Sequence, residues 1–206
     1  EQMGKQGLLG SRGDPATSLE GRVGSYMMPA VFGMAGMEHA RAHGTQMEHF
    51  AMASVKNHFH STGNPLAQYQ KESPLDEVMN ARMIAYPNTL LMCCPTGDGA
   101  KDRREQYHLT EPIKIAASVL TSDPWTARDE TLADINTLTR NAAKIAYEQA
   151  GIGPEDLDQV ELHDCFATAE LLHYENLGLC DEGMAGKHIA SGATWIGNKI
   201  PTKYEE

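Results

Sequence analysis

The chain has 206 residues, of which 41% are hydrophobic and 22% charged, which is typical of a globular protein of one or two domains. Its formal net charge of −11 argues against a nucleic-acid surface, because clustered lysines and arginines are what hold a phosphate backbone. No run approaches the roughly 18 consecutive apolar residues of a membrane span, and the N-terminal segment lacks the pattern of a secretory signal. We therefore expect a soluble, cytoplasmic protein.

The Gly-rich segment 1–30 is predicted to be mostly loop. From Pro29 to Leu91 the pattern indicates short helices separated by turns. Thr45 and Glu48 have the spacing of a capping box and should open a helix that ends near Asn57. A second helix should begin with Ser73 as N-cap and Pro74 at its first position.

The histidines and cysteines of this region are not predicted to form a metal site. His39 and His43 have helical spacing, and His58 and His60 have strand spacing, but no acidic or thiolate ligand follows at a matching position. The four cysteines lack zinc-ribbon spacing and are expected to be reduced thiols: Cys93, Cys94, Cys165 and Cys180. Cys93 and Cys94 are interpreted as buried small hydrophobes.

The second half of the chain alternates predicted strands and helices. Residues 113–120 form an apolar run typical of a buried strand, and a long helix should follow from about 131 to 150, where Gly151 stops it. A helical turn is expected over residues 153–157, a strand over 159–162, and a helix over 166–177. This order predicts an α/β fold with a parallel sheet.

His163, Asp164 and Cys165 stand between the predicted strand and helix. A helix N-terminus offers free N–H groups and positive potential, so we expect Cys165 to have a lowered pKa. Cys165 is then a candidate nucleophile or acid/base, and His163 a candidate hydrogen-bond donor to an oxyanion. The alternative is structural: a buried cysteine and a hydrogen-bonded histidine.

Several stretches resemble thiolases of the sterol-carrier-protein type, in the same order along the chain. They are residues 35–39 (Ala-Gly-Met-Glu-His), 56–58 (Lys-Asn-His), 64–65 (Asn-Pro), 93–100 (Cys-Cys-Pro-Thr-Gly-Asp-Gly-Ala), 160–166 (Val-Glu-Leu-His-Asp-Cys-Phe), 170–172 and 174–180. The resemblance implies that His163 contributes to an oxyanion hole and that Cys165 is an acid/base. The nucleophile of that family is a different cysteine.

The chain also departs from the family pattern. The nucleophilic cysteine would lie before Glu1, and the Gly-His-Pro histidine would follow a glycine-rich segment beyond Trp195. After Ala100, a polar run stands where the family has an alanine- and valine-rich strand. We therefore expect a partial thiolase-like layered fold, with a helical loop region (1–95), a connection with an apparent deletion (96–112) and the start of the C-terminal half (113–206).

The resemblance implies an acyl-CoA C-acyltransferase that acts on 3-oxoacyl-CoA thioesters through a cysteine acyl-enzyme. Coenzyme A would be a substrate, no cofactor would be bound, and the protein would form homo-oligomers. One alternative is a thiolase-like steroid side-chain aldolase, which works with a zinc-ribbon partner carrying an OB-fold. Another is an inactive subunit that binds CoA esters or lipid, and a peroxisomal location is the alternative to the cytoplasm.

Overall fold

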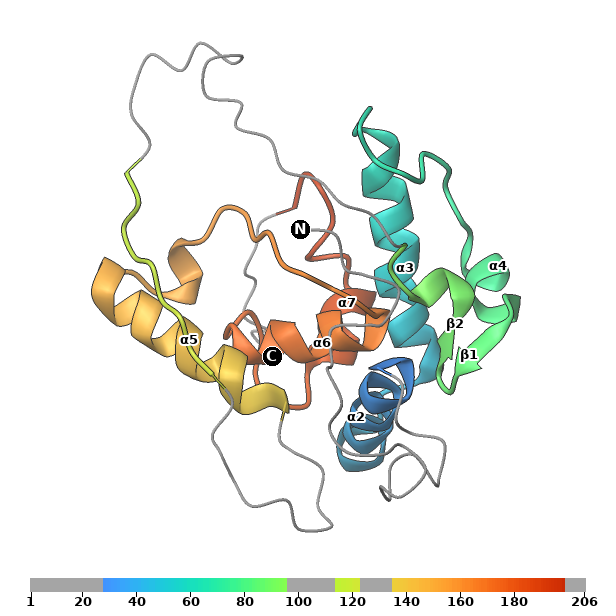
Figure 1. Cartoon of the computed structure of the whole chain (residues 1–206), viewed down its shortest axis with the longest axis horizontal. Helices are drawn as coiled ribbons and strands as arrows, with labels where there is room; N and C mark the ends of the chain where they lie inside the picture. Colours follow the sequence, from blue (N-terminus) through green and yellow to red (C-terminus); the bar gives the residue numbers. More distant parts are fainter. Residues whose placement is uncertain (1–27, 96–113, 123–134, 199–206) are drawn as a thin grey trace, which may run out of the picture.

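The computed structural model describes residues 28–95, 114–122 and 135–198, and these residues are mainly helical (Figure 1). Predictions for residues 1–27, 96–113 and 123–134 lie outside this part of the chain. In chain order the elements are α2 (Met28–His43), α3 (Met47–Thr62), α4 (Leu75–Asn80), β1 (Met83–Ala85), β2 (Asn88–Thr89), η1 (Leu90–Met92), α5 (Ile135–Ala150), η2 (Pro154–Asp156), α6 (Ala167–Asn176) and α7 (Ala185–Ala190). None of these helices is long and apolar enough to cross a membrane.

Helix α3 begins and ends later than the sequence predicts. Its N-cap is Gln46, whose backbone N–H donates to Nδ1 of His49 at 3.0 Å, so the predicted capping box of Thr45 and Glu48 is wrong. The Thr45 hydroxyl is instead hydrogen-bonded to Nδ1 of His39 at 2.9 Å. The helix passes Asn57 and continues to Thr62, because the next glycine that can end it is Gly63.

Helix α4 is shifted by one residue from its predicted start. Pro74 is the N-cap, with an extended ψ of 160°, and its carbonyl accepts the N–H of Val78 at 3.1 Å. Ser73 precedes the cap and is buried. After α4 the chain makes the antiparallel pair β1 and β2, which packs against α2. Gly33 of α2 permits this contact, because a Cβ there would lie 2.6 Å from the carbonyl oxygen of Tyr86.

The predicted helices of the second half are confirmed with small changes at their ends. Helix α5 ends at Ala150, before Gly151, whose φ of 70° favours glycine. The helical turn predicted over residues 153–157 is η2, and the helix predicted over residues 166–177 is α6. Helix α6 stops before Gly178, which also has a positive φ, of 73°.

Helix α6 is the centre of the described structure. It packs against α2, α3, α5 and α7, and Figure 1 shows it between these neighbours. All its residues except His173 and Glu175 are buried. The hydrophobic core joins both parts of the chain: Phe50, Ala51, Ala53, Val78 and Met92 from the first, and Ala167, Leu171, Tyr174, Leu179, Cys180, Ala185 and Ile189 from the second.

The two strands predicted in the second half are wrong for the described residues. Residues 114–122 and 159–162 have no strand pairing, and the described part of the chain contains only the two-stranded sheet of β1 and β2. Ile115 and Leu120 are 82% and 97% exposed, although the sequence predicted a buried strand. An apolar run becomes a buried strand only when other strands pair with it, and the described residues supply none.

Candidate active site

A short contact between two distant segments positions the residues that precede α6. Cys93 and Phe166 form an isolated antiparallel β-bridge, and the backbone N–H of Cys94 donates to the carbonyl oxygen of Cys165 at 3.0 Å. Phe166 is the N-cap of α6, and its carbonyl accepts the N–H of Ala169 at 2.8 Å. The bridge therefore fixes the His163-Asp164-Cys165 turn against the segment that follows η1.

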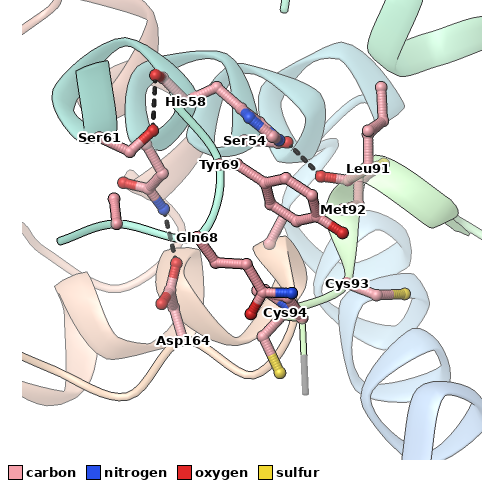
Figure 2. Close-up of a pocket in the computed structure, with 14 residues that line it drawn as sticks. Ser54, His58, Ser61, Gln68, Tyr69, Leu91, Met92, Cys93, Cys94 and Asp164 are labelled. Carbon is pink, nitrogen blue, oxygen red and sulfur yellow. Dashed lines mark hydrogen bonds between the residues drawn. The ribbon is translucent and has the colours of Figure 1, made fainter. Parts of the chain in front are cut away.

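A cavity of about 230 Å³ opens beside this contact (Figure 2). Its walls come from α3, from the loop 67–69, from the segment 91–95 and from the start of α6. Asp164 lines the cavity, whereas Cys165 and His163 are not among its lining residues. Figure 2 shows the Asp164 carboxyl directed toward the α3 side chains. Sequence analysis predicted the right turn but did not single out the residue that faces the cavity.

The Asp164 carboxyl belongs to a polar network that joins α3 to α6. The side-chain amide of Asn57 donates to Oδ2 of Asp164 at 2.5 Å and to Oε2 of Glu170 at 2.6 Å. The other oxygen of Glu170 accepts hydrogen bonds from the Lys56 ammonium and the Tyr174 hydroxyl. Lys56 and Glu170 are buried, with side chains 9% and 3% exposed. Burial first, and then the nearby charge of Glu170, raise the pKa of Asp164 from 3.8 to about 7.

Cys165 does not have the lowered pKa that the sequence predicted. Burial, together with the neighbouring Cys94 and Asp164, raises the pKa of its thiol to about 11. The thiol is half-buried and lies outside α6, which begins at Ala167, so desolvation outweighs the helix N-terminus. The predicted lowering of the Cys165 pKa is therefore wrong, whereas the role of Cys165 as an acid/base remains a prediction.

His163 is exposed, and it makes no hydrogen bond with the Cys165 thiol among the described residues. Burial lowers the pKa of His173 on α6, the charge of Glu170 raises it, and the nearby His163 lowers it by a smaller amount. His163 is therefore placed near α6 with an open face, and its role as an oxyanion donor stays a prediction.

The remaining cysteines and histidines differ in their surroundings, and Cys93, Cys94 and His58 line the cavity. Cys94 is exposed, so the prediction that it is a buried hydrophobe is wrong, while Cys93 is half-buried with its thiol donating to the carbonyl of Thr89 at 3.3 Å. His39 is buried and paired with Glu175 at 2.8 Å. Within the described residues, no three His, Cys, Asp or Glu side chains are arranged to hold a metal ion.

The network is not evident from the sequence, because its members have the pattern of ordinary solvent-facing helix residues. Lys56, Asn57 and Glu170 carry no motif that predicts burial, and Lys56 and Glu170 are 114 positions apart. The available signals were the stretch 56–58, which is one of the family-like stretches, and the position of Asp164 inside the His-Asp-Cys-Phe motif.

Comparisons with known proteins fit this arrangement. Residues 121–205 match the family described as "Thiolase C-terminal domain-like". The chain is 41% identical over 182 residues to sterol carrier protein 2 of Rattus norvegicus, covering 83% of this chain and 33% of that protein. It is 37% identical over 180 residues to the benzoylsuccinyl-CoA thiolase subunit BbsB of Thauera aromatica, covering 84% of this chain and 46% of the relative.

The fold comparison gives the same class. The solved structure named Ltp2-ChsH2(DUF35) aldolase superimposes with a TM-score of 0.74 and 25% identity, covering 87% of this chain and 50% of that one. The predicted class, a partial thiolase-like fold, is thus confirmed.

Residues 121–205 thus match a thiolase C-terminal-like domain, and over most of its length the chain is similar to members of the thiolase superfamily. Its similarity to sterol carrier protein 2 agrees with the predicted sterol-carrier-protein type. The chain spans between a third and a half of the length of the curated relatives described above.

Proposed function

We propose that the full protein is an acyl-CoA C-acyltransferase that cleaves 3-oxoacyl-CoA esters with coenzyme A. The observation that carries the proposal is the His163-Asp164-Cys165 turn, which the backbone hydrogen bond from Cys94 to Cys165 holds beside a cavity. Relatives support it by their names, which include an acetyl-CoA acetyltransferase of Methanothermobacter thermautotrophicus, 35% identical over 180 residues.

The reaction is a double displacement. Another cysteine of the full protein attacks the 3-oxo carbon as its thiolate, the bond between carbons 2 and 3 breaks, and the acyl group remains on that cysteine as a thioester. The acetyl-CoA carbanion that leaves takes the proton of the Cys165 thiol. The Cys165 thiolate then takes the proton of the incoming CoA thiol, whose sulfur accepts the acyl group. The products are acetyl-CoA and a shortened acyl-CoA.

The surroundings of Cys165 suit the first of these proton transfers. A thiol with a pKa of about 11 keeps its proton at neutral pH, so it is available to the carbanion. His163 would donate a hydrogen bond to the thioester oxygen on which negative charge develops, and its exposure leaves its face open to a substrate. In this proposal no metal or bound cofactor is needed, and the protein would form a homo-oligomer.

A second candidate is a steroid side-chain aldolase, since a solved aldolase shares the fold. Its partner would be a zinc-ribbon protein carrying an OB-fold. The family of such aldolases tends to have a tyrosine where His163 stands, so His163 favours the acyltransferase.

Product analysis of the full protein tests these candidates. Given acetoacetyl-CoA and CoA, the acyltransferase forms two molecules of acetyl-CoA, and Cys165→Ala abolishes their formation. Cys180→Ala is the matched control, because Cys180 is buried in the core away from the turn. Cleavage only of 3-hydroxyacyl-CoA esters to a ketone would favour the aldolase. Binding of CoA esters without any cleavage would overturn both and leave a binding subunit.

A further inference from the structure

The network beneath the His163–Cys165 turn contains more carboxyl groups than cations. Asp164 and Glu170 are both bound by the Asn57 amide, whose two donated hydrogen bonds bring the carboxyl groups close together. Lys56 is the cation that contacts this pair among the described residues, and it donates to Glu170. Two carboxylates held close together by one amide repel each other, which favours a proton on one of them.

The charges around Asp164 come from every element packed against it. Glu170 and Tyr174 face it from α6, Lys56 faces it from α3, and Cys94 and Cys165 face it from the bridged segments. Tyr174 and the thiols are neutral at neutral pH, because burial raises the pKa of each. One ammonium can balance one carboxylate, so a second buried carboxylate would be uncompensated, and such a group takes up a proton instead.

We propose that Asp164 and Glu170 form a carboxyl pair that shares one proton, and that Asp164 is a positioning residue that controls the negative charge beside Cys165. The pair would act in two ways. The Asn57 hydrogen bonds tie the turn to α3, and the shared proton keeps the site under Cys165 electrically balanced. This inference rests on the proposed role of Cys165 for its catalytic meaning, whereas the shared proton can be tested without any turnover.

The geometry explains why Asp164 has this effect. It precedes Cys165 directly, and both residues lie next to the Cys94 bridge. When Asp164 loses its proton, the new negative charge makes the Cys165 thiolate less favourable. Above neutral pH, Cys165 would therefore hold its proton more tightly and accept the CoA proton more readily. Below neutral pH this influence would be absent.

Isotope-edited infrared spectroscopy of the protein with 13C-labelled aspartate tests the shared proton. We expect a protonated aspartate carboxyl that persists up to about pH 7 and disappears in Asp164→Asn. Asp158→Asn is the matched control, since Asp158 is exposed on the preceding loop. Asn57→Ser removes the two donated hydrogen bonds but keeps both carboxyls, and should make the signal persist to higher pH. Absence of the signal in the unmodified protein, or its survival in Asp164→Asn, would overturn the proposal.

Alkylation of Cys165, followed by peptide mass spectrometry, tests the link to the thiol. Above about pH 8, Asp164→Asn should react roughly threefold to tenfold faster than the unmodified protein, because a neighbouring negative charge is gone. Asp158→Asn should react at the original rate. Equal rates in both variants would show that Asp164 does not control the charge at Cys165.

Turnover separates this inference from the proposed function. If the protein is an acyltransferase, Asp164→Asn should remove the change in kcat near neutral pH that the unmodified protein shows. If the protein has no acyltransferase activity, the infrared and alkylation results still stand, and only the catalytic meaning of the pair is lost. A normal kcat profile in Asp164→Asn, in an active enzyme, would contradict a role in the reaction.

Discussion

Helix α6 carries toward each of its ends a glutamate whose side chain is buried, Glu170 at 3% and Glu175 at 6% exposure, and the two have different surroundings. Toward the N-terminal end, Glu170 accepts a hydrogen bond from the Lys56 ammonium and shares the Asn57 amide with a second carboxyl, Asp164. Toward the C-terminal end, Glu175 has its own partner, His39, at 2.8 Å, and also accepts the backbone N–H of Ala185 at 3.1 Å. Burial alone is common to both, so it does not distinguish a candidate site from a structural contact.

The difference lies in the balance of charge. At the Glu175 end the carboxylate has its own partners, and the hydrogen bond and charge of His39 leave the pKa of Glu175 below 4.5 although burial raises it. At the Asp164 end a group is left that titrates near neutral pH. Groups with such values are enriched at functional sites, which is why we place the site at the N-terminal end of α6.

The largest expected effect comes from removing the cation at the unbalanced end. Lys56→Met should lower the free energy of unfolding by about 3 to 5 kcal/mol, because it leaves buried carboxyls without a compensating charge. The same substitution at Lys71, whose pair with Glu77 is exposed, should cost at most about 1 kcal/mol. Urea unfolding measures both, and equal losses would mean that the buried network contributes no more than a surface pair.

The next effect separates chemistry from stability. In the full protein, His163→Ala should reduce turnover, because the loss of one oxyanion donor raises the activation free energy by roughly 2.7 to 4 kcal/mol. Because His163 is exposed, the free energy of unfolding should hardly change. His39→Ala is the matched control, and it should show the reverse pattern. A His163→Ala enzyme with normal kcat and only a raised KM would place His163 in binding.

A smaller loss is expected at the balanced end of α6. Glu175→Gln keeps the shape of the side chain but removes the charged hydrogen bond to His39, which should cost about 1.5 to 3 kcal/mol of stability. Thermal and urea unfolding should agree, and turnover of the full protein should be unaffected. A loss of activity with unchanged stability would mean that this end of α6 also belongs to the site.

The smallest expected effect is on the slope of the free energy of unfolding against pH. Its sign differs between the two ends of α6. The pKa of Asp164 is raised from 3.8 to about 7, so its contribution to stability is present below about pH 4 and is lost as the pH rises to about 7. The pKa of Glu175 is lowered from 4.5, so its contribution is present above that pH and is lost on acidification.

Each slope is at most about 1.4 kcal/mol per pH unit. Unfolding measured across this range in Asp164→Asn and Glu175→Gln should remove one slope each. If both variants lose the slope in the same direction, the charge balance that we describe for the two ends is incorrect.

The sequence predicted the helices better than the strands. Helices α5 and α6 were predicted near their observed ends, because apolar spacing and the stops at Gly151 and Gly178 are local signals. The apolar pattern of residues 113–120 predicted a buried strand, but whether an apolar run is buried depends on partners far along the chain.

The site was predicted only in part, for the same reason. The motif drew attention to His163 and Cys165, whose catalytic roles remain predictions. The raised pKa of Cys165 and the pairing of Asp164 depend on Cys94, Asn57 and Glu170, which no local pattern brings together. Charge balance in a buried network is a property of three-dimensional neighbours.

The backbone hydrogen bond from Cys94 to Cys165 also bears on the kinetics of folding. It closes a loop of 71 residues (165 minus 94), and such distant contacts are slow to form because chain entropy opposes them. The packing of α3 on α6 spans a longer separation still, but it buries apolar core residues of both helices, whereas the turn is held by backbone hydrogen bonds. We therefore expect α3 and α6 to pack first, with the turn at Asp164 becoming ordered afterwards. A substitution that weakens the bridge, such as Cys94→Pro, which removes the donated N–H, should then accelerate unfolding more than it slows folding.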